Sequence, residues 1–209
     1  MISGLESEAL YALKGAVVFG VMLVLVGRSL AAHHPFPRFG PANRVTAVRA
    51  LIVALVAALV GETPTTGIAW AAAGAAVLVA ALDGLDGWLA RRTGMMSDFG
   101  ARFDMEVDAF FILVLSVLAW QHDKAGSWVL LCGVMRYAFV AAGWLMPWMA
   151  RPLRSTLRGK AVAVGQIAGL AVALVPSVQP PLSALIALAT LATLVWSFAL
   201  DVAWLWRRR

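Results

Sequence analysis

The stretch ALDGLDGWLARRTGMMSDFGARFDMEVDAF, residues 81–110, places four aspartates in a short window of a strongly apolar chain. Apolar residues make up 62% of the 209 and charged residues only 13%, with a mean hydropathy of +0.84. Soluble domains have about 45–50% apolar and about 25% charged residues. The composition therefore predicts an all-α integral membrane protein. The aspartates need a specific explanation, because an ionised carboxylate at mid-bilayer costs about 2.5–3.5 kcal/mol.

Seven apolar segments approach the roughly 20 residues that a helix needs to cross a bilayer. They fall near residues 9–27, 45–61, 67–90, 101–121, 126–149, 159–177 and 181–206. Of the 17 basic residues, 14 lie at every second break between segments or at the C-terminus, which the positive-inside rule assigns to the cytoplasm. We therefore expect seven spans with an outside N-terminus, or six spans with the first helix lying in the membrane interface. The membrane would be the inner or plasma membrane in a bacterium.

The net charge of +6 fits this topology and contact with anionic membrane lipids, and nothing in the sequence supports a nucleic-acid partner. We divide the chain into an N-terminal helix and cytoplasmic loop over residues 1–42 and a transmembrane domain over residues 43–209.

The four aspartates are spaced so that they meet at one place. Asp83 and Asp86 share one helix face, Asp104 and Asp108 share a face of the next helix, and the short segment between them folds the two helices side by side. Four like charges repel one another unless a cation lies among them. With only oxygen ligands, the preferred cations are Mg²⁺, Mn²⁺ or Ca²⁺, and a pair of divalent ions is typical of phosphoryl-transfer sites.

Small residues around the aspartates let a ligand or a helix approach the backbone closely. Written as a pattern, residues 83–108 read D-x2-D-G-x2-A-R-x8-G-x3-D-x3-D. This pattern resembles the signature of the CDP-alcohol phosphotransferase family, class I, at every fixed position. Upstream, PANRVTAVR at residues 41–49 resembles the P-N-x-[IV]-T-x-x-R start of that family's first core helix, with Ala42 between the proline and Asn43.

The resemblance implies a six-helix transmembrane core, so the leading segment is an extra transmembrane or interfacial helix. It implies an enzyme that cleaves the pyrophosphate of a CDP-linked lipid or alcohol, releases CMP and passes the phosphoryl-linked group to an acceptor hydroxyl. By analogy, two divalent cations, Mg²⁺ or Mn²⁺, bind to Asp83, Asp86, Asp104 and Asp108, and Asp108 is also the general base. The nucleotide would contact Asn43, Thr46, Gly87, Ala90, Arg91 and Gly100. A homodimer is expected, with the active site facing the cytoplasm.

A basic pocket for a phosphorylated acceptor or a lipid phosphate is predicted from Arg136, Arg154, Arg158 and Lys160. Glu106 faces away from the metal face, and its expected partner is Arg102 four residues earlier or a second subunit. Asp201 is expected to reach the membrane interface or Arg207.

These features favour CDP-diacylglycerol as the donor in phospholipid biosynthesis, with a polyol phosphate such as glycerol phosphate among the possible acceptors. One alternative is an aminoalcohol phosphotransferase of the CDP-choline or CDP-ethanolamine type with a lipid acceptor, which a donor competition assay separates. A divalent-cation transporter is the alternative from another class, and it would move Mn²⁺ without releasing CMP.

Overall fold

Every regular element in the described part of the chain is helical. The computed structural model describes residues 2–33, 36, 38–151 and 157–208. The long helices are α1 (Ile2–His33), α2 (Pro41–Ala57), α3 (Thr66–Thr93), α4 (Asp98–Gln121), α5 (Leu130–Leu145), α6 (Leu157–Leu174) and α7 (Leu182–Trp206). Two short 3₁₀ turns, η1 (Ser127–Val129) and η2 (Pro147–Ala150), flank α5. The prediction of an all-α protein is confirmed.

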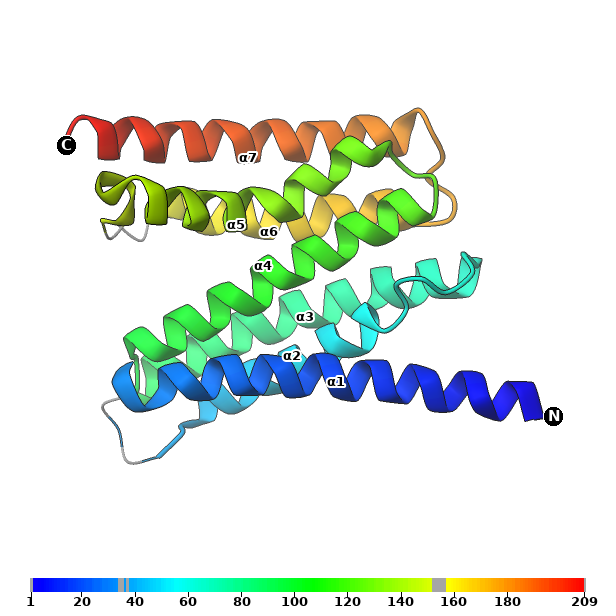
Figure 1. Ribbon diagram of the computed structural model, residues 1–209, viewed down its shortest axis with the longest axis horizontal. Helices are drawn as coiled ribbons and strands as arrows, with labels where there is room; N and C mark the ends of the chain where they lie inside the picture. Colours follow the sequence, from blue (N-terminus) through cyan, green and yellow to red (C-terminus); the bar gives the residue numbers. More distant parts are fainter. Residues whose placement is uncertain (1, 34–35, 37, 152–156, 209) are drawn as a thin grey trace.

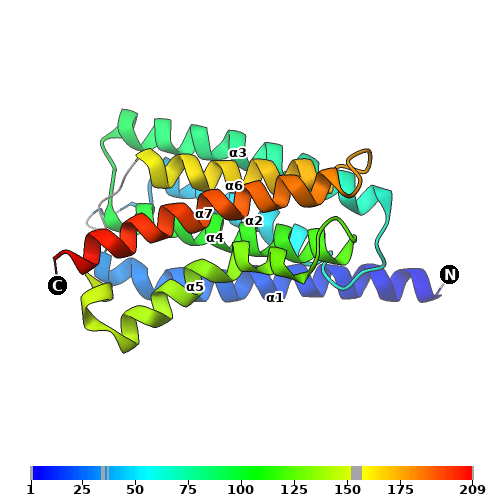
Figure 2. The same cartoon turned by 90° about the horizontal axis from the view of Figure 1, so that it is seen from above.

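The helices run along one common direction and alternate in sense, so that the two termini lie at opposite ends of the molecule (Figures 1 and 2). Within the described residues, five helices are long and apolar enough to cross a membrane, namely α1, α3, α5, α6 and α7. Helix α2 has only 17 residues, and α4 carries five charged side chains in its first eleven residues. The chain is a membrane-integral helical protein, and its most polar helices are the ones packed inside the bundle.

Four helices surround the centre of the bundle. Helix α2 packs against α3 on one side and α4 on the other, and α6 also packs against both of them. Helices α3 and α4 contact each other only slightly, so they lie diagonally across this group instead of side by side as the sequence suggested. Helix α1 covers α2 and α4 from outside, while α5 and α7 lie against α4 and α6. The space between α3 and α4 is therefore available for polar side chains.

The connection between α3 and α4 is short because both helix ends are capped locally. Gly94 ends α3 with φ +66°, in the left-handed region that suits glycine. Ser97 caps the start of α4, and its hydroxyl accepts a hydrogen bond from the Gly100 amide at 3.1 Å. The aspartates that follow and precede this turn are consequently kept at the same end of the bundle.

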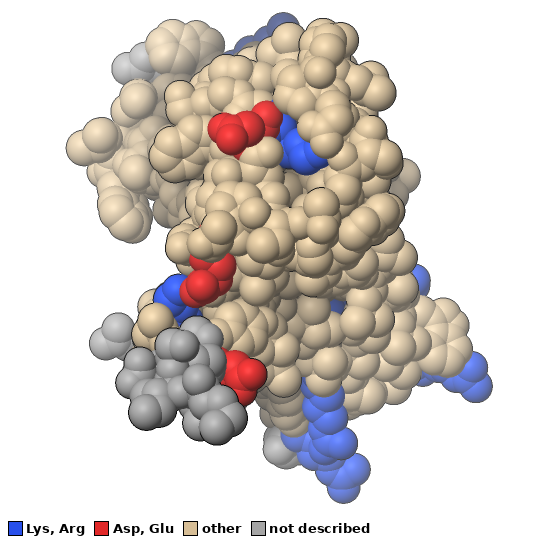
Figure 3. Space-filling model, turned by 90° about the vertical axis from the view of Figure 1, so that its right-hand side faces the viewer, with Lys and Arg blue, Asp and Glu red and all other residues tan. Residues whose placement is uncertain are grey.

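The two ends of the bundle differ in charge. Basic residues gather in the loops and terminal turns at the end that holds the α3–α4 turn and the C-terminus: Arg38, Arg44, Arg91, Arg92, Arg102, Arg151, Arg158, Lys160, Arg207 and Arg208. We call this the basic end. Figure 3 views the opposite end, where only a few charged groups interrupt the surface.

A buried lysine ties together two connections at that opposite end. The ammonium of Lys124 donates to the carbonyl oxygens of Val178 at 2.7 Å and Val175 at 3.2 Å, and the Ser183 hydroxyl donates to the Lys124 carbonyl at 2.6 Å. Burial lowers the pKa of the Lys124 amine. These bonds join the α4–α5 connection to the α6–α7 connection at the end of the bundle opposite the α3–α4 turn.

Candidate active site

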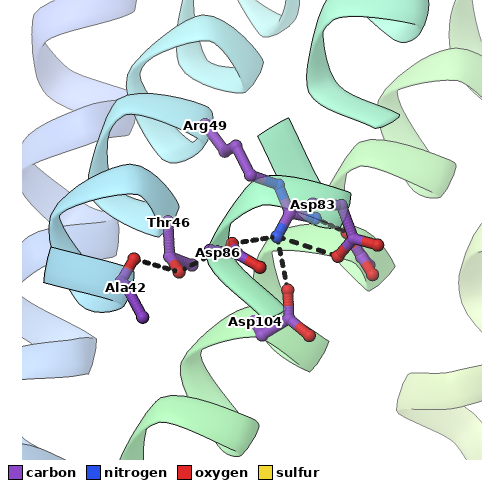
Figure 4. Close-up of polar contacts among 7 residues, drawn as sticks. Ala42, Thr46, Arg49, Asp83, Asp86 and Asp104 are labelled. Carbon is purple, nitrogen blue, oxygen red and sulfur yellow. Dashed lines mark hydrogen bonds and ion pairs between the residues drawn. The ribbon is translucent and has the colours of Figure 1, made fainter. Parts of the chain in front are cut away.

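The aspartates meet around one arginine that comes from α2. The side chain of Arg49 is fully buried, and its guanidinium contacts all four carboxylates. One terminal nitrogen, Nη1, lies 2.8 Å from Asp86 Oδ2 and 3.0 Å from Asp83 Oδ1, and it also bonds to Asp104. The other, Nη2, bonds to Asp108. Figure 4 shows Arg49 reaching from α2 to the carboxylates on α3 and α4.

The cluster is closed on one side and open on the other. The side chain of Asp86 is 6% exposed, whereas those of Asp83 and Asp104 are 32% and 38% exposed. Asp108 lies between these extremes. A ligand can therefore reach the cluster from the side of Asp83 and Asp104, while Asp86 and Arg49 form its floor.

Thr46 supports this floor from the turn of α2 that precedes Arg49. Its hydroxyl lies 3.0 Å from Asp86 Oδ2 and 3.2 Å from the Ala42 carbonyl, which are alternative acceptors for its single hydrogen. Asp86 is thus bound by both a hydroxyl and a guanidinium. Its position is fixed more firmly than those of the exposed aspartates.

Apart from Thr46, the residues predicted to contact the nucleotide fall into two groups. Asn43 is buried, its amide donates to the Phe39 carbonyl at 2.5 Å, and a Cβ added to Gly100 would lie 2.9 Å from its Oδ1. Asn43 and Gly100 are therefore neighbours across α2 and α4. On α3, a Cβ at Gly87 would lie 3.4 Å from the Arg91 guanidinium, so Arg91 folds back over that glycine. Ala90 is half-buried near the same end of the helix.

The donor set fits a hard divalent cation. Carboxylate oxygens of Asp83, Asp104 and Asp108 lie within 4.8 Å of one another, which is close enough for one ion to bind all three. The single positive charge of Arg49 neutralises only one of the four carboxylates when all are ionised, so the cluster still attracts cations. Oxygen-only coordination matches Mg²⁺ and Mn²⁺ better than zinc.

A comparison with known protein families identifies the family of the chain. The family model described as CDP-alcohol phosphatidyltransferase matches residues 39–198, which is most of the sequence.

The chain belongs to the CDP-alcohol phosphatidyltransferase family.

No curated protein and no solved structure matches it. The CDP-alcohol phosphatidyltransferases transfer a phosphatidyl group from a CDP-alcohol and depend on divalent cations. The match begins after α1, so α1 lies outside the part of the chain that the family model covers.

The four basic residues predicted to bind the acceptor are not gathered in one pocket in the described part of the chain. Arg136 on α5 forms an ion pair with Glu106 on α4, which is a different partner from the Arg102 expected for Glu106. Arg158 on α6 pairs with Asp201 on α7, where Arg207 or the membrane interface was expected. Lys160 is exposed, and Arg154 lies outside the described residues. Among these residues, both described arginines tie neighbouring helices together.

Arg49 is the site residue that sequence reasoning missed. In the sequence it was only the last residue of PANRVTAVR and one of the basic residues counted at the breaks, with no role at the site, although its side chain is fully buried at the centre of the bundle. A signal was present in the sequence. Asn43, Thr46 and Arg49 are spaced by three residues along α2, so they form a polar stripe on an otherwise apolar helix.

Proposed function

We propose that this protein transfers the phosphatidyl group of CDP-diacylglycerol to the hydroxyl of an acceptor alcohol and releases CMP. The observation that carries the proposal is the convergence of four aspartates from two helices, with oxygens of three of them within 4.8 Å of one another. The family supplies the reaction class. We infer CDP-diacylglycerol as the donor and a polyol phosphate such as glycerol phosphate as one acceptor.

Two divalent cations, Mg²⁺ or Mn²⁺, are proposed at the aspartates, with Asp83, Asp104 and Asp108 as ligands and Asp86 contributing from the floor of the cluster. Bound there, the cations neutralise the charge of the pyrophosphate and stabilise CMP as the leaving group. Asn43, Gly87, Ala90, Arg91 and Gly100 are proposed to hold the cytidine and its phosphates. Thr46 is proposed to hold the Asp86 carboxylate in place through its hydroxyl, which lies 3.0 Å from Asp86 Oδ2.

Asp108 is the proposed general base. Its carboxylate takes the proton of the acceptor hydroxyl as the hydroxyl oxygen attacks the phosphorus that carries the diacylglycerol. The bond from that phosphorus to the bridging oxygen breaks, and CMP leaves with the electron pair. The products are the new phosphodiester, CMP and one proton. Before the cations bind, Arg49 bonds to Asp108 and keeps its carboxylate within the cluster.

The substrates need access from two directions. The exposed carboxylates of Asp83 and Asp104 lie toward the basic end, and we propose that this end faces the cytoplasm, where CTP-derived nucleotides are found. The diacylglycerol chains would enter from the bilayer between helices. The predicted homodimer remains a proposal, and so does a role of Arg158 or Lys160 in holding an acceptor phosphate.

The test is CMP release by purified protein in mixed micelles that contain CDP-diacylglycerol, Mn²⁺ or Mg²⁺, and a panel of acceptors. Unlabelled CDP-choline is added as a competitor to separate the two donor classes. Asp108→Asn should lower the rate of CMP release by at least roughly a hundredfold, because a positioned base contributes about 10²–10⁴-fold.

The matched control is Asp123→Asn. This aspartate is exposed beyond the other end of α4 and has φ +55°, a conformation that asparagine also tolerates. It should keep the wild-type rate. The proposal fails if no CDP-linked donor is consumed with any acceptor, or if Asp108→Asn and the control release CMP equally fast. Mn²⁺ uptake into vesicles without CMP release would point to a transporter instead.

A further inference from the structure

The positively charged guanidinium of Arg49 lies in the middle of the carboxylate cluster. The guanidinium of Arg49 bonds to Asp83, Asp86, Asp104 and Asp108 at once, and its side chain has no exposed surface. An arginine side chain is not deprotonated in proteins. Its charge is therefore constant at any pH at which the protein is folded.

The oxygens that Arg49 contacts belong to the carboxylates that would bind a divalent ion. Three of its four partners, Asp83, Asp104 and Asp108, are the residues whose oxygens are close enough to bind one ion together. A carboxylate has two oxygens and accepts about four bonds, so it can bind both cations, but it then divides its negative charge between them. The guanidinium and a divalent ion would also repel each other across a few ångströms.

We propose that Arg49 is an internal counter-cation that competes with the catalytic metal for the aspartates. Before a metal binds, Arg49 holds the four carboxylates together and keeps their positions. When a metal binds, Asp83, Asp104 and Asp108 turn toward it and Arg49 stays anchored on Asp86. Arg49 is thus a positioning residue that sets how tightly the metal binds. This inference rests on the metal site of the proposed function.

The competition gives Arg49 two opposite effects that a purely structural residue would not have. Removing the guanidinium should destabilise the metal-free protein, because four buried or half-buried carboxylates lose the counter-charge that they share within the described part of the chain. The same change should strengthen metal binding, because one repulsive positive charge is removed. Stability in chelator and affinity for metal should therefore move in opposite directions.

The experiment compares wild type, Arg49→Gln and Arg49→Lys, with Arg44→Gln as the matched control, since Arg44 is exposed on the same helix. Binding of Mn²⁺ alone is measured by the loss of the free-ion EPR signal, without any CDP-linked substrate. Melting temperatures are measured in EDTA and in saturating Mn²⁺. Arg49→Gln should bind Mn²⁺ at least roughly tenfold more tightly than wild type. Its melting temperature should fall in EDTA and rise more on Mn²⁺ addition than that of wild type.

Arg49→Lys should lie between the other two, because it keeps the charge on a single nitrogen that reaches fewer carboxylates. If Arg49→Gln does not fold in either buffer, Arg49→Lys carries the test through its larger Mn²⁺-dependent rise in melting temperature. Equal loss of stability with and without Mn²⁺, or unchanged Mn²⁺ affinity, overturns the inference alone. Absence of Mn²⁺ binding to a wild-type protein overturns the metal part of the proposed function as well.

Discussion

The contact between α4 and α5 allows a quantitative test of how the site is positioned. Gly133 on α5 is buried, and a Cβ added to it would lie 2.4 Å from Leu113 Cα and 2.8 Å from Leu113 Cβ on α4. Carbon atoms in a packed interior are about 3.5–4.0 Å apart. Because the nearest atom belongs to the backbone, the substitution Gly133→Ala must separate the two helices by about 1 Å.

The expected magnitudes follow from this separation. Overpacking costs typically 1–3 kcal/mol, and a clash with backbone atoms, which cannot turn aside, falls in the upper part of that range, at about 2–3 kcal/mol. The better helix propensity of alanine returns about 1 kcal/mol, so the net cost is about 1–2 kcal/mol. At roughly 2–4 °C for each kcal/mol in a chain of this size, the melting temperature should fall by roughly 2–8 °C. Leu113 follows Asp108 by five residues, or about 7.5 Å along α4. Since a 1 Å displacement can lower a rate about a hundredfold, we expect kcat to fall by about tenfold.

The assays are thermal unfolding in detergent and CMP release at saturating substrate, with Gly74→Ala as the control. A Cβ at Gly74, on α3, meets nothing within 4 Å, so this variant should match wild type or be slightly more stable. A Gly133→Ala protein that melts and turns over like wild type would refute the close contact between α4 and α5 and its link to the position of Asp108.

Three further experiments probe other parts of the molecule. Gly100→Ala brings a Cβ to 2.9 Å from Asn43 Oδ1 and should raise KM for the CDP donor severalfold with little change in melting temperature. An unchanged KM would contradict the proposed contact of Asn43 and Gly100 with the nucleotide. Replacing Lys124 by methionine removes a charged donor from buried carbonyls and should cost about 1.5–3 kcal/mol of stability, measured by denaturant unfolding. The kcat of the folded protein should stay the same. Undiminished stability would contradict the role of Lys124 in joining the two connections. Cysteines introduced at Ser177 and Thr93, which lie exposed at opposite ends of the bundle, should react with an impermeant maleimide on intact cells only at Ser177, and the reverse labelling would invert the proposed orientation.

The aspartate cluster was predictable because its geometry is local. Spacings of three and four residues place side chains on one helix face, and Gly94 and Ser97 make the intervening turn short. The positive charges at every second break likewise predicted one basic end. What the spacing did not give is the diagonal arrangement of α3 and α4, because that depends on how α2 and α6 pack between them.

The partners in the ion pairs were not predictable either, because they also depend on how the helices pack against one another. Glu106 pairs with Arg136, which is 30 residues away, and Arg158 pairs with Asp201, which is 43 residues away. Rules for charge pairs within a helix suggest only neighbours three or four residues apart. Arg49 was misassigned because a count of charges near loops does not distinguish an arginine at a helix end from one that points into the bundle.

The buried arginine also constrains how the protein is made. Synthesis delivers Arg49 on α2 first, then Asp83 and Asp86 on α3, and last Asp104 and Asp108 on α4. An unpaired arginine at the centre of a membrane helix costs about 2.5–3.5 kcal/mol on insertion scales, and α2 is short. Because α2 makes its most extensive contacts with α3, the two should leave the translocon as a hairpin in which Arg49 already meets its first carboxylates. The charge pairs that later organise catalysis would then first serve to bring a polar helix into the lipid.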